Sequence, residues 1–303
     1  MIFGWVTKAA SIRVGCYDHE TKQVTKATLK EKLKPDSHGV PSLLVRPDGR
    51  LIAFYAKHYD KKASLYRVSE NPEDVSSWGP EMEVGTDGGY SDFTHAVQLA
   101  KEGNRIYLFR RGDNFSVSRD AVHWTPAKKL MEKKIREGHK RRSGHAPYLK
   151  VASNGTDAIH LALVECGPVD WKDVKTSIFY ACYRDGALYK ANGSKIKDLG
   201  QLPLKEVEAE KVYDGNSAGF AAWLGDIAID RAGNPVILYF VFLTYGKDAQ
   251  TRLRYRYARW NGKRWDNHTI TEAVSTRHPG CYNSGGPSLH HGDPSIVYLA
   301  RPV

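Results

Sequence analysis

The sequence has little of what marks several common protein classes. Its four cysteines (Cys16, Cys166, Cys182 and Cys281) are widely spaced and include no CxxC pair, which argues against a disulfide scaffold or a zinc ribbon. No run approaches the roughly 18 apolar residues of a membrane-spanning helix, and the first 15 residues lack the apolar core of a signal peptide. No glycine-rich phosphate loop links a strand to a helix, so no nucleotide or redox cofactor is expected.

Acidic residues and methionine are also scarce. There are 34 Asp and Glu against 45 Lys and Arg, a formal net charge of +11. This balance favours an anionic partner, and nucleic acid, a membrane surface and an acidic glycan all qualify on charge alone. Only 3 Met accompany 17 Tyr and 7 Trp, a balance that suits β-strands and sugar-facing surfaces better than helical bundles.

One phrase recurs along the chain: a β-rich run, a tight turn centred on glycine, and a second β-rich run. It occurs at 41–58, 95–112, 147–164 and 226–242, with further hairpins at 177–193 and 252–270 and a closing strand at 294–300. Repeats of roughly 40–50 residues with several strands each are typical of propeller blades. The sequence therefore predicts an all-β propeller over 1–303 as a single domain, with only 130–142 resembling a helix.

Three turns, at 118–125 (SRDAVHWT), 68–78 and 259–265, resemble partial Asp-boxes. In such a turn the Asp binds backbone amides and the Trp packs between blades. We therefore expect these tryptophans to be structural rather than catalytic.

The order of the phrases is more specific than any one of them. DSHGVPSLLVRPDGRLIAFYAKH (36–58), AVQLAKEGNRIYLFRRG (96–112), HAPYLKVASNGTDAIHLAL (145–163), AWLGDIAIDRAGNPVILYF (222–240) and GDPSIVYLA (292–300) resemble successive blades of the BNR-4 type of bacterial-neuraminidase-repeat propeller. The resemblance implies a seven-bladed propeller. The family includes ulvan lyases and rhamnose–glucuronate lyases beside members of unknown activity. The resemblance thus implies a polysaccharide lyase that cleaves a uronic-acid-containing glycan by β-elimination. We expect the protein to be a monomer. That substrate favours a secreted or periplasmic location, although the compartment stays open.

A uronate lyase must neutralise the sugar carboxylate, remove the proton beside it and protonate the leaving oxygen. Arginine or protonated histidine suits the first task, and histidine or tyrosine suits the other two. His38 and His58 bracket the first phrase, at ends of a hairpin that lie side by side, so both imidazoles can reach one pocket. The similar lyases carry a histidine pair at such positions, and either residue could be the base.

The second phrase supplies further candidates. Neighbouring strand residues face opposite ways, so at most one of Arg110 and Arg111 should enter the pocket. The resemblance makes Arg111 the residue that neutralises the carboxylate. The other arginine would form a salt bridge or face solvent, and Arg110 is also a candidate substrate contact. The similar lyases have a catalytic tyrosine near position 95, where this chain has His95. Either His95 takes the acid–base role, or Tyr90 reaches in, or the chemistry is altered.

Three more groups complete the predicted site. Tyr148 matches a family tyrosine that lines the pocket and is the alternative acid. Arg142 and His145, in a basic loop, are predicted to contact substrate. Near the C-terminus a cluster of metal-capable side chains could hold a structural zinc or calcium ion, although its spacing matches no specific zinc pattern: His278, Cys281, His290 and His291.

Three other functions compete with the lyase. A non-catalytic propeller that binds acidic glycans would explain the missing tyrosine near position 95. A sialidase-like glycoside hydrolase would need three arginines and a Tyr–Glu pair, which the sequence does not offer. A nucleic-acid binder is supported by charge, but no nucleic-acid-binding fold is evident. We therefore expect an acidic polysaccharide as the partner, and neither nucleic acid nor a membrane.

Overall fold

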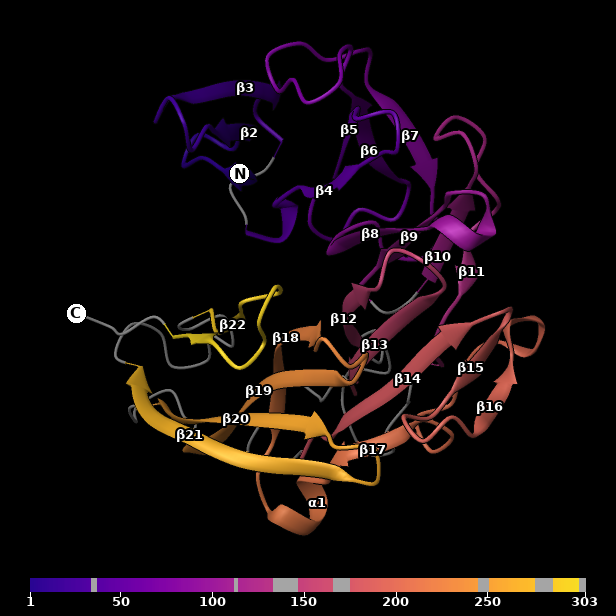
Figure 1. Cartoon of the computed structure of the whole chain (residues 1–303), viewed down its shortest axis with the longest axis vertical. Helices are drawn as coiled ribbons and strands as arrows, with labels where there is room; N and C mark the ends of the chain where they lie inside the picture. Colours follow the sequence, from indigo (N-terminus) through magenta and orange to yellow (C-terminus); the bar gives the residue numbers. More distant parts are fainter. Residues whose placement is uncertain are drawn as a thin grey trace. The chain divides into compact units, whose positions relative to one another are not determined.

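The computed structural model describes residues 1–33, 37–111, 114–132, 147–165, 175–244, 251–275 and 286–299. The chain divides into two compact units, Met1–Leu130 and Met131–Val303. Strands dominate both (Figure 1). No helix in the described segments is long and apolar enough to cross a membrane.

The first unit contains three antiparallel sheets in which consecutive strands pair (Figure 1). Their strands are β1 (Ile2–Val6), β2 (Ile12–Tyr17) and β3 (Val24–Lys30); β4 (Ser42–Val45), β5 (Leu51–Tyr55), β6 (Ala63–Val68) and β7 (Met82–Gly85); and β8 (Thr94–Leu99), β9 (Arg105–Arg110), β10 (Asn114–Ser118) and β11 (Lys128–Lys129). The 3₁₀ turns η1 (Ser37–Gly39) and η2 (Ala100–Glu102) precede β4 and β9.

In the second unit, too, strands that follow one another in the chain pair within each sheet. Its first sheet holds β12 (Tyr148–Ser153), β13 (Ala158–Val164), β14 (Ile178–Arg184), β15 (Ala187–Tyr189), β16 (Lys195–Asp198) and β17 (Glu210–Tyr213), the last paired with β14. The next holds β18 (Ala222–Ile229), β19 (Pro235–Thr244), β20 (Thr251–Trp260) and β21 (Trp265–Ser275), and a small one holds β22 (Ser288–Leu289) and β23 (Val297–Tyr298). The turn η3 (Leu199–Gln201) and the helix α1 (Gly215–Ala218) lie between strands.

The prediction of an all-β propeller is confirmed, but the number of blades was wrong. Among the residues that the structure describes, five sheets have three or more strands, so five blades are present there rather than seven. The hairpins at 177–193 and 252–270 supply β14–β15 and β20–β21, which continue the sheets begun by β12–β13 and β18–β19. They widen existing blades instead of adding new ones.

The second strand of a blade is the most deeply buried. β5 (LIAFY) and β13 (AIHLALV) are buried at every residue. A strand covered on both faces needs no polar alternation, which explains why these runs are continuously apolar. The one polar side chain in β13, His160, is therefore packed inside the second unit.

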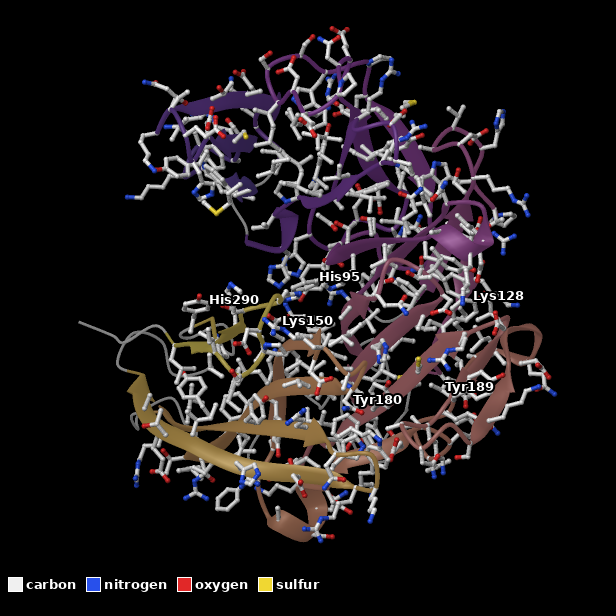
Figure 2. The ribbon with its side chains drawn as sticks, viewed as in Figure 1. His95, Lys128, Lys150, Tyr180, Tyr189 and His290 are labelled. Carbon is white, nitrogen blue, oxygen red and sulfur yellow. The ribbon has the colours of Figure 1, made fainter. Side chains whose placement is uncertain are left out.

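His160 predicts a specific pH dependence of stability. It is 5% exposed, and its Nδ1 lies 2.6 Å from the hydroxyl of Tyr180 (Tyr180 is labelled in Figure 2). Burial, helped by the nearby Arg184 charge, lowers the pKa of His160 from 6.5 to about 4. The unfolded chain then binds the extra proton between these two values, so the free energy of unfolding falls by about 3 kcal/mol as the pH drops from 6.5 to 4.

We expect His160→Gln to remove most of this dependence, because glutamine does not titrate. The measurement is urea unfolding of wild type and variant at pH 7, 5.5 and 4.5. His268→Gln, on the exposed part of β21, is the matched control and should keep the wild-type slope. An unchanged slope in His160→Gln would show that other groups cause the loss.

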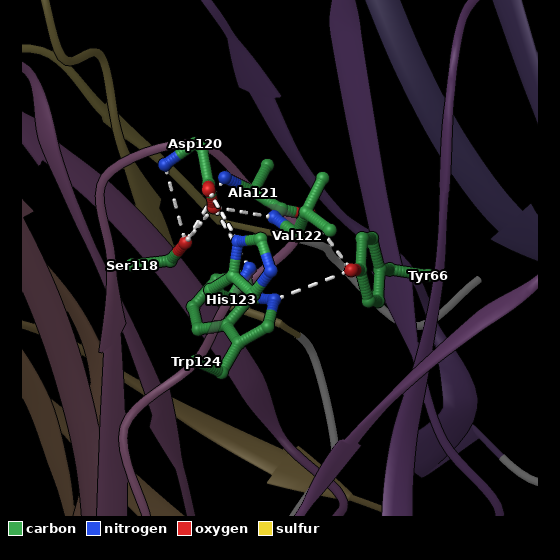
Figure 3. Close-up of polar contacts among 7 residues, drawn as sticks. All are labelled: Tyr66, Ser118, Asp120, Ala121, Val122, His123 and Trp124. Atoms are coloured by element: carbon green, nitrogen blue, oxygen red, sulfur yellow. Dashed lines mark hydrogen bonds and ion pairs between the residues drawn. The ribbon is translucent and has the colours of Figure 1, made fainter.

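The Asp-box turn at 118–125 has the structural role that its sequence predicts (Figure 3). The Asp120 carboxylate accepts hydrogen bonds from the backbone amides two and three residues on, both at 2.8 Å. Trp124 donates from Nε1 to the hydroxyl of Tyr66 (3.2 Å), which itself donates to the Ala121 carbonyl (2.7 Å). Trp124 also packs edge-on against Phe54 of β5, so the turn fastens the β8–β11 sheet to the β4–β7 sheet.

Candidate functional site

The first hairpin brings its two histidines into contact. β4 and β5 pair antiparallel, so the residues before β4 and after β5 emerge at the same end of the sheet. The rings of His38, in η1, and His58, just beyond β5, stack with centroids 3.6 Å apart and planes 7° apart. A Cβ at Gly39 would lie only 3.0 Å from the Ala56 carbonyl oxygen, so a side chain at this position would hinder the approach of the two segments.

Aromatic rings extend this pair on both sides. Tyr59 stacks on His58, with centroids 3.8 Å apart and planes 19° apart. Phe93 meets the His38 ring edge-on at 4.4 Å. The imidazole of His58 is therefore the middle ring of a three-ring stack, and its side chain is only 10% exposed. Tyr59 at the end of the stack is 52% exposed.

A buried ion pair lies against the stack. Arg111 donates to both oxygens of Asp92, from Nε to Oδ1 (2.9 Å) and from a terminal nitrogen to Oδ2 (2.6 Å), and both side chains are fully buried. The same Oδ2 accepts the backbone N–H of Tyr59 (3.2 Å) and lies 3.8 Å from Nε2 of His58. Asp92 thus binds the arginine and the tyrosine backbone, and its carboxylate lies beside a histidine.

Arg111 is enclosed by rings as well as by Asp92. Its guanidinium carbon lies 4.5 Å from the ring centroid of Tyr90, 5.2 Å from that of Tyr59 and 5.4 Å from that of Phe93, distances at which a cation and an aromatic ring attract. The predicted contact between Arg111 and a substrate carboxylate would need one of these rings to move. In this conformation the guanidinium of Arg111 is fully buried against Asp92.

Arg110 is buried elsewhere, between two sheets of the first unit. It donates to the hydroxyl of Ser64 on β6 (3.0 Å), and to the Asn114 amide oxygen (2.7 Å) and the Ser116 hydroxyl (3.1 Å) on β10. Burial lowers the pKa of Arg110 to about 10, against the opposing charge of Asp87. Its contacts are those of a residue that joins sheets.

The backbone around the stack is strained. Tyr59 (φ 63°), Phe93 (φ 52°) and Arg111 (φ 50°) all adopt the left-handed conformation without being glycine. Each such residue costs of order 1–3 kcal/mol, and residues of this kind concentrate at functional sites. Three of them in one cluster, beside a stacked histidine pair, mark it as the candidate active site.

Comparison with known proteins agrees with the resemblance seen in the sequence. The sequence model described as "BNR repeat-containing family member" matches residues 3–273. The chain belongs to the BNR repeat-containing family. No curated protein matches this BNR repeat protein in sequence.

Solved structures share its fold. A PL25 ulvan lyase bound to -[GlcA(1-4)Rha3S]- superposes with a TM-score of 0.73 at 17% identity, over 98% of this chain and 73% of that chain. Another structure of a PL25 ulvan lyase gives a TM-score of 0.72 at 18% identity, with the same coverage of both chains. An α-L-arabinanase of Penicillium chrysogenum complexed with arabinobiose gives a TM-score of 0.49 at 10% identity, over 86% of this chain and 74% of that chain.

Two further predicted site residues of the BNR repeat protein, His95 and Tyr148, lie on strands. His95, labelled in Figure 2, is the second residue of β8. It pairs with Phe109 of β9. Tyr148 belongs to the second unit, where it packs against Trp223 at 4.6 Å. Arg142 and His145 lie outside the described residues.

The predicted metal cluster can be followed only in part, because His278 and Cys281 also lie outside the described residues. His290 accepts the Asp293 amide at Nδ1 (2.9 Å), within a turn. Across the described segments, no group of three or more His, Cys, Asp or Glu side chains is placed to hold a metal ion.

Sequence reasoning missed a polar cluster on β12 and β18 of the second unit. Asp226 accepts hydrogen bonds from the Leu289 amide (3.0 Å) and from Nε2 of His291 (3.1 Å). Burial raises the pKa of Asp226, but these bonds and the charge of Lys150 outweigh it and hold that pKa below its ordinary value. The bond with Asp226 raises the pKa of His291, and burial lowers that of Lys150 (labelled in Figure 2). The negative charge of Asp226 thus lies beside the positive charge of Lys150 and the imidazole of His291, an arrangement typical of a structural network.

Proposed function

We propose that this BNR repeat protein is a polysaccharide lyase that cleaves a uronic-acid-containing glycan by β-elimination. The observation that carries the proposal is the stacked pair of His38 and His58 against the buried Asp92–Arg111 ion pair. The fold shared with ulvan lyases supports it, as does the net charge of +11, which favours an acidic polymer.

The stacked pair can divide the chemistry between its two rings. The rings lie with centroids 3.6 Å apart, close enough to act on the same sugar. In the proposed division, His58, whose Nε2 lies 3.8 Å from the Asp92 carboxylate, meets the carboxylate of the uronic acid. His38 is then the base.

In the proposed reaction, protonated His58 neutralises the carboxylate of the uronic acid and makes the adjacent C5 proton more acidic. His38 accepts that proton, the C5–H electrons form the C4=C5 double bond, and the C4–O bond breaks. His38 then returns the proton to the leaving oxygen, so one residue serves as base and acid. Arg111 holds Asp92, and through it His58, in place.

The test is the ultraviolet absorbance of the unsaturated uronate product. The protein is incubated with ulvan, gum arabic, pectin, alginate and glycosaminoglycans. A rise with one of them would support the lyase and name its glycan class. No rise on any polymer, together with salt-sensitive binding to one of them, would instead favour a glycan-binding propeller.

A further inference from the structure

Tyr59 combines exposure with rigidity. Its side chain is 52% exposed, yet its backbone is held in a left-handed conformation (φ 63°) by the hydrogen bond from its N–H to the buried Asp92. One face of its ring is covered by His58 at 3.8 Å. A surface tyrosine with no function would not need this strained and fixed setting. The ring is presented to solvent in one orientation.

A positive charge lies on the same surface. Tyr59 meets Tyr90 edge-on, with centroids 6.2 Å apart, and the ammonium of Lys61 lies 5.0 Å from the centre of the Tyr90 ring. Lys61 is exposed. The neighbouring Asp60 carboxylate accepts the Lys62 amide (2.8 Å) within the turn.

We propose that Tyr59 and Lys61 form a subsite for an anionic sugar of the glycan, next to the histidine pair. The apolar face of a pyranose ring lies against the exposed face of Tyr59, because an aromatic ring binds such a surface with large contact area at low entropic cost. A carboxylate or sulfate on that sugar meets the ammonium of Lys61, which binds anions as a point charge. The subsite rests on the proposed lyase function for the reaction beside it, but its binding can be measured independently.

The first variant is Tyr59→Gly, which removes the ring and relieves the backbone, because glycine adopts φ 63° without cost. We expect its Kd for ulvan to rise by about tenfold, from the loss of one aromatic contact. Tyr59→Phe keeps the ring and should bind as wild type does. Tyr298→Ala is the matched control, since Tyr298 is 53% exposed, and it should leave Kd unchanged.

The second variant is Lys61→Met, with Lys26→Met on the exposed strand β3 as its control. We expect Lys61→Met to weaken ulvan binding about threefold. Desulfated ulvan and carboxyl-reduced ulvan identify the anion: the polymer on which Lys61→Met no longer differs from wild type has lost the group that Lys61 binds. Wild-type Kd values for both Tyr59→Gly and Lys61→Met would overturn the subsite.

Two outcomes separate this subsite from the lyase proposal. If wild type produces unsaturated uronate and Tyr59→Gly changes neither KM nor Kd, the subsite is wrong and the lyase stands. If no polymer yields product but Tyr59→Gly weakens binding, the subsite stands on a protein that binds glycan without cutting it.

Discussion

His38→Ala is expected to lower kcat for unsaturated uronate formation by about 100-fold to 10,000-fold, the usual contribution of a general base. The variant loses one ring of the stacked pair, while His58 stays beside Asp92. KM should change little, because the carboxylate of the substrate still meets His58. The measurement is the initial rate of ultraviolet absorbance increase over a range of substrate concentrations.

His268→Ala is a matched control for His38→Ala, because it removes an exposed imidazole from β21. It should keep the wild-type rate. Added imidazole should restore part of the activity of His38→Ala, since a small base can enter the space beside His58. A His38→Ala enzyme with wild-type kcat would remove His38 from the role of base.

Much of the fold could be predicted because β-hairpins are local. The apolar runs around Gly49 and Gly155 gave the β4–β5 and β12–β13 hairpins correctly, and the position of His38 and His58 at the two ends of the first hairpin predicted that their rings could meet. The number of blades was wrong, because seven came from the family resemblance, and the hairpin pattern could not correct it: a hairpin does not tell whether its strands join an existing sheet or begin another.

The surroundings of the histidines could not be predicted in this way. Asp92 lies in GGYSDF, a polar stretch typical of a loop, and only tertiary packing shows that its carboxylate is buried against Arg111. The alternation rule expected at most one pocket-facing arginine, but it assumes a regular strand. Arg111 follows the end of β9 with φ 50°, and this turn of the backbone directs it to Asp92. Tyr59 was missed because it too lies beyond the end of a strand, with φ 63°.

Asp92→Ala is expected to lower the free energy of unfolding by about 3–5 kcal/mol, because it leaves the Arg111 charge buried without its carboxylate. The three rings around the guanidinium compensate for only part of that loss. Urea unfolding followed by tryptophan fluorescence measures the difference. A loss below about 1 kcal/mol would mean that water or another group replaces the carboxylate.

The double variant Asp92→Ala with Arg111→Met separates stability from chemistry. Methionine places an apolar side chain among Tyr59, Tyr90 and Phe93, so the double variant should be more stable than Asp92→Ala alone. It still lacks the carboxylate that lies beside His58 and accepts the Tyr59 amide, so its activity should stay low. Recovered stability with lost activity would assign Asp92 a positioning role in the reaction. Recovery of both stability and activity would mean that the ion pair is only structural and that the histidines act without it.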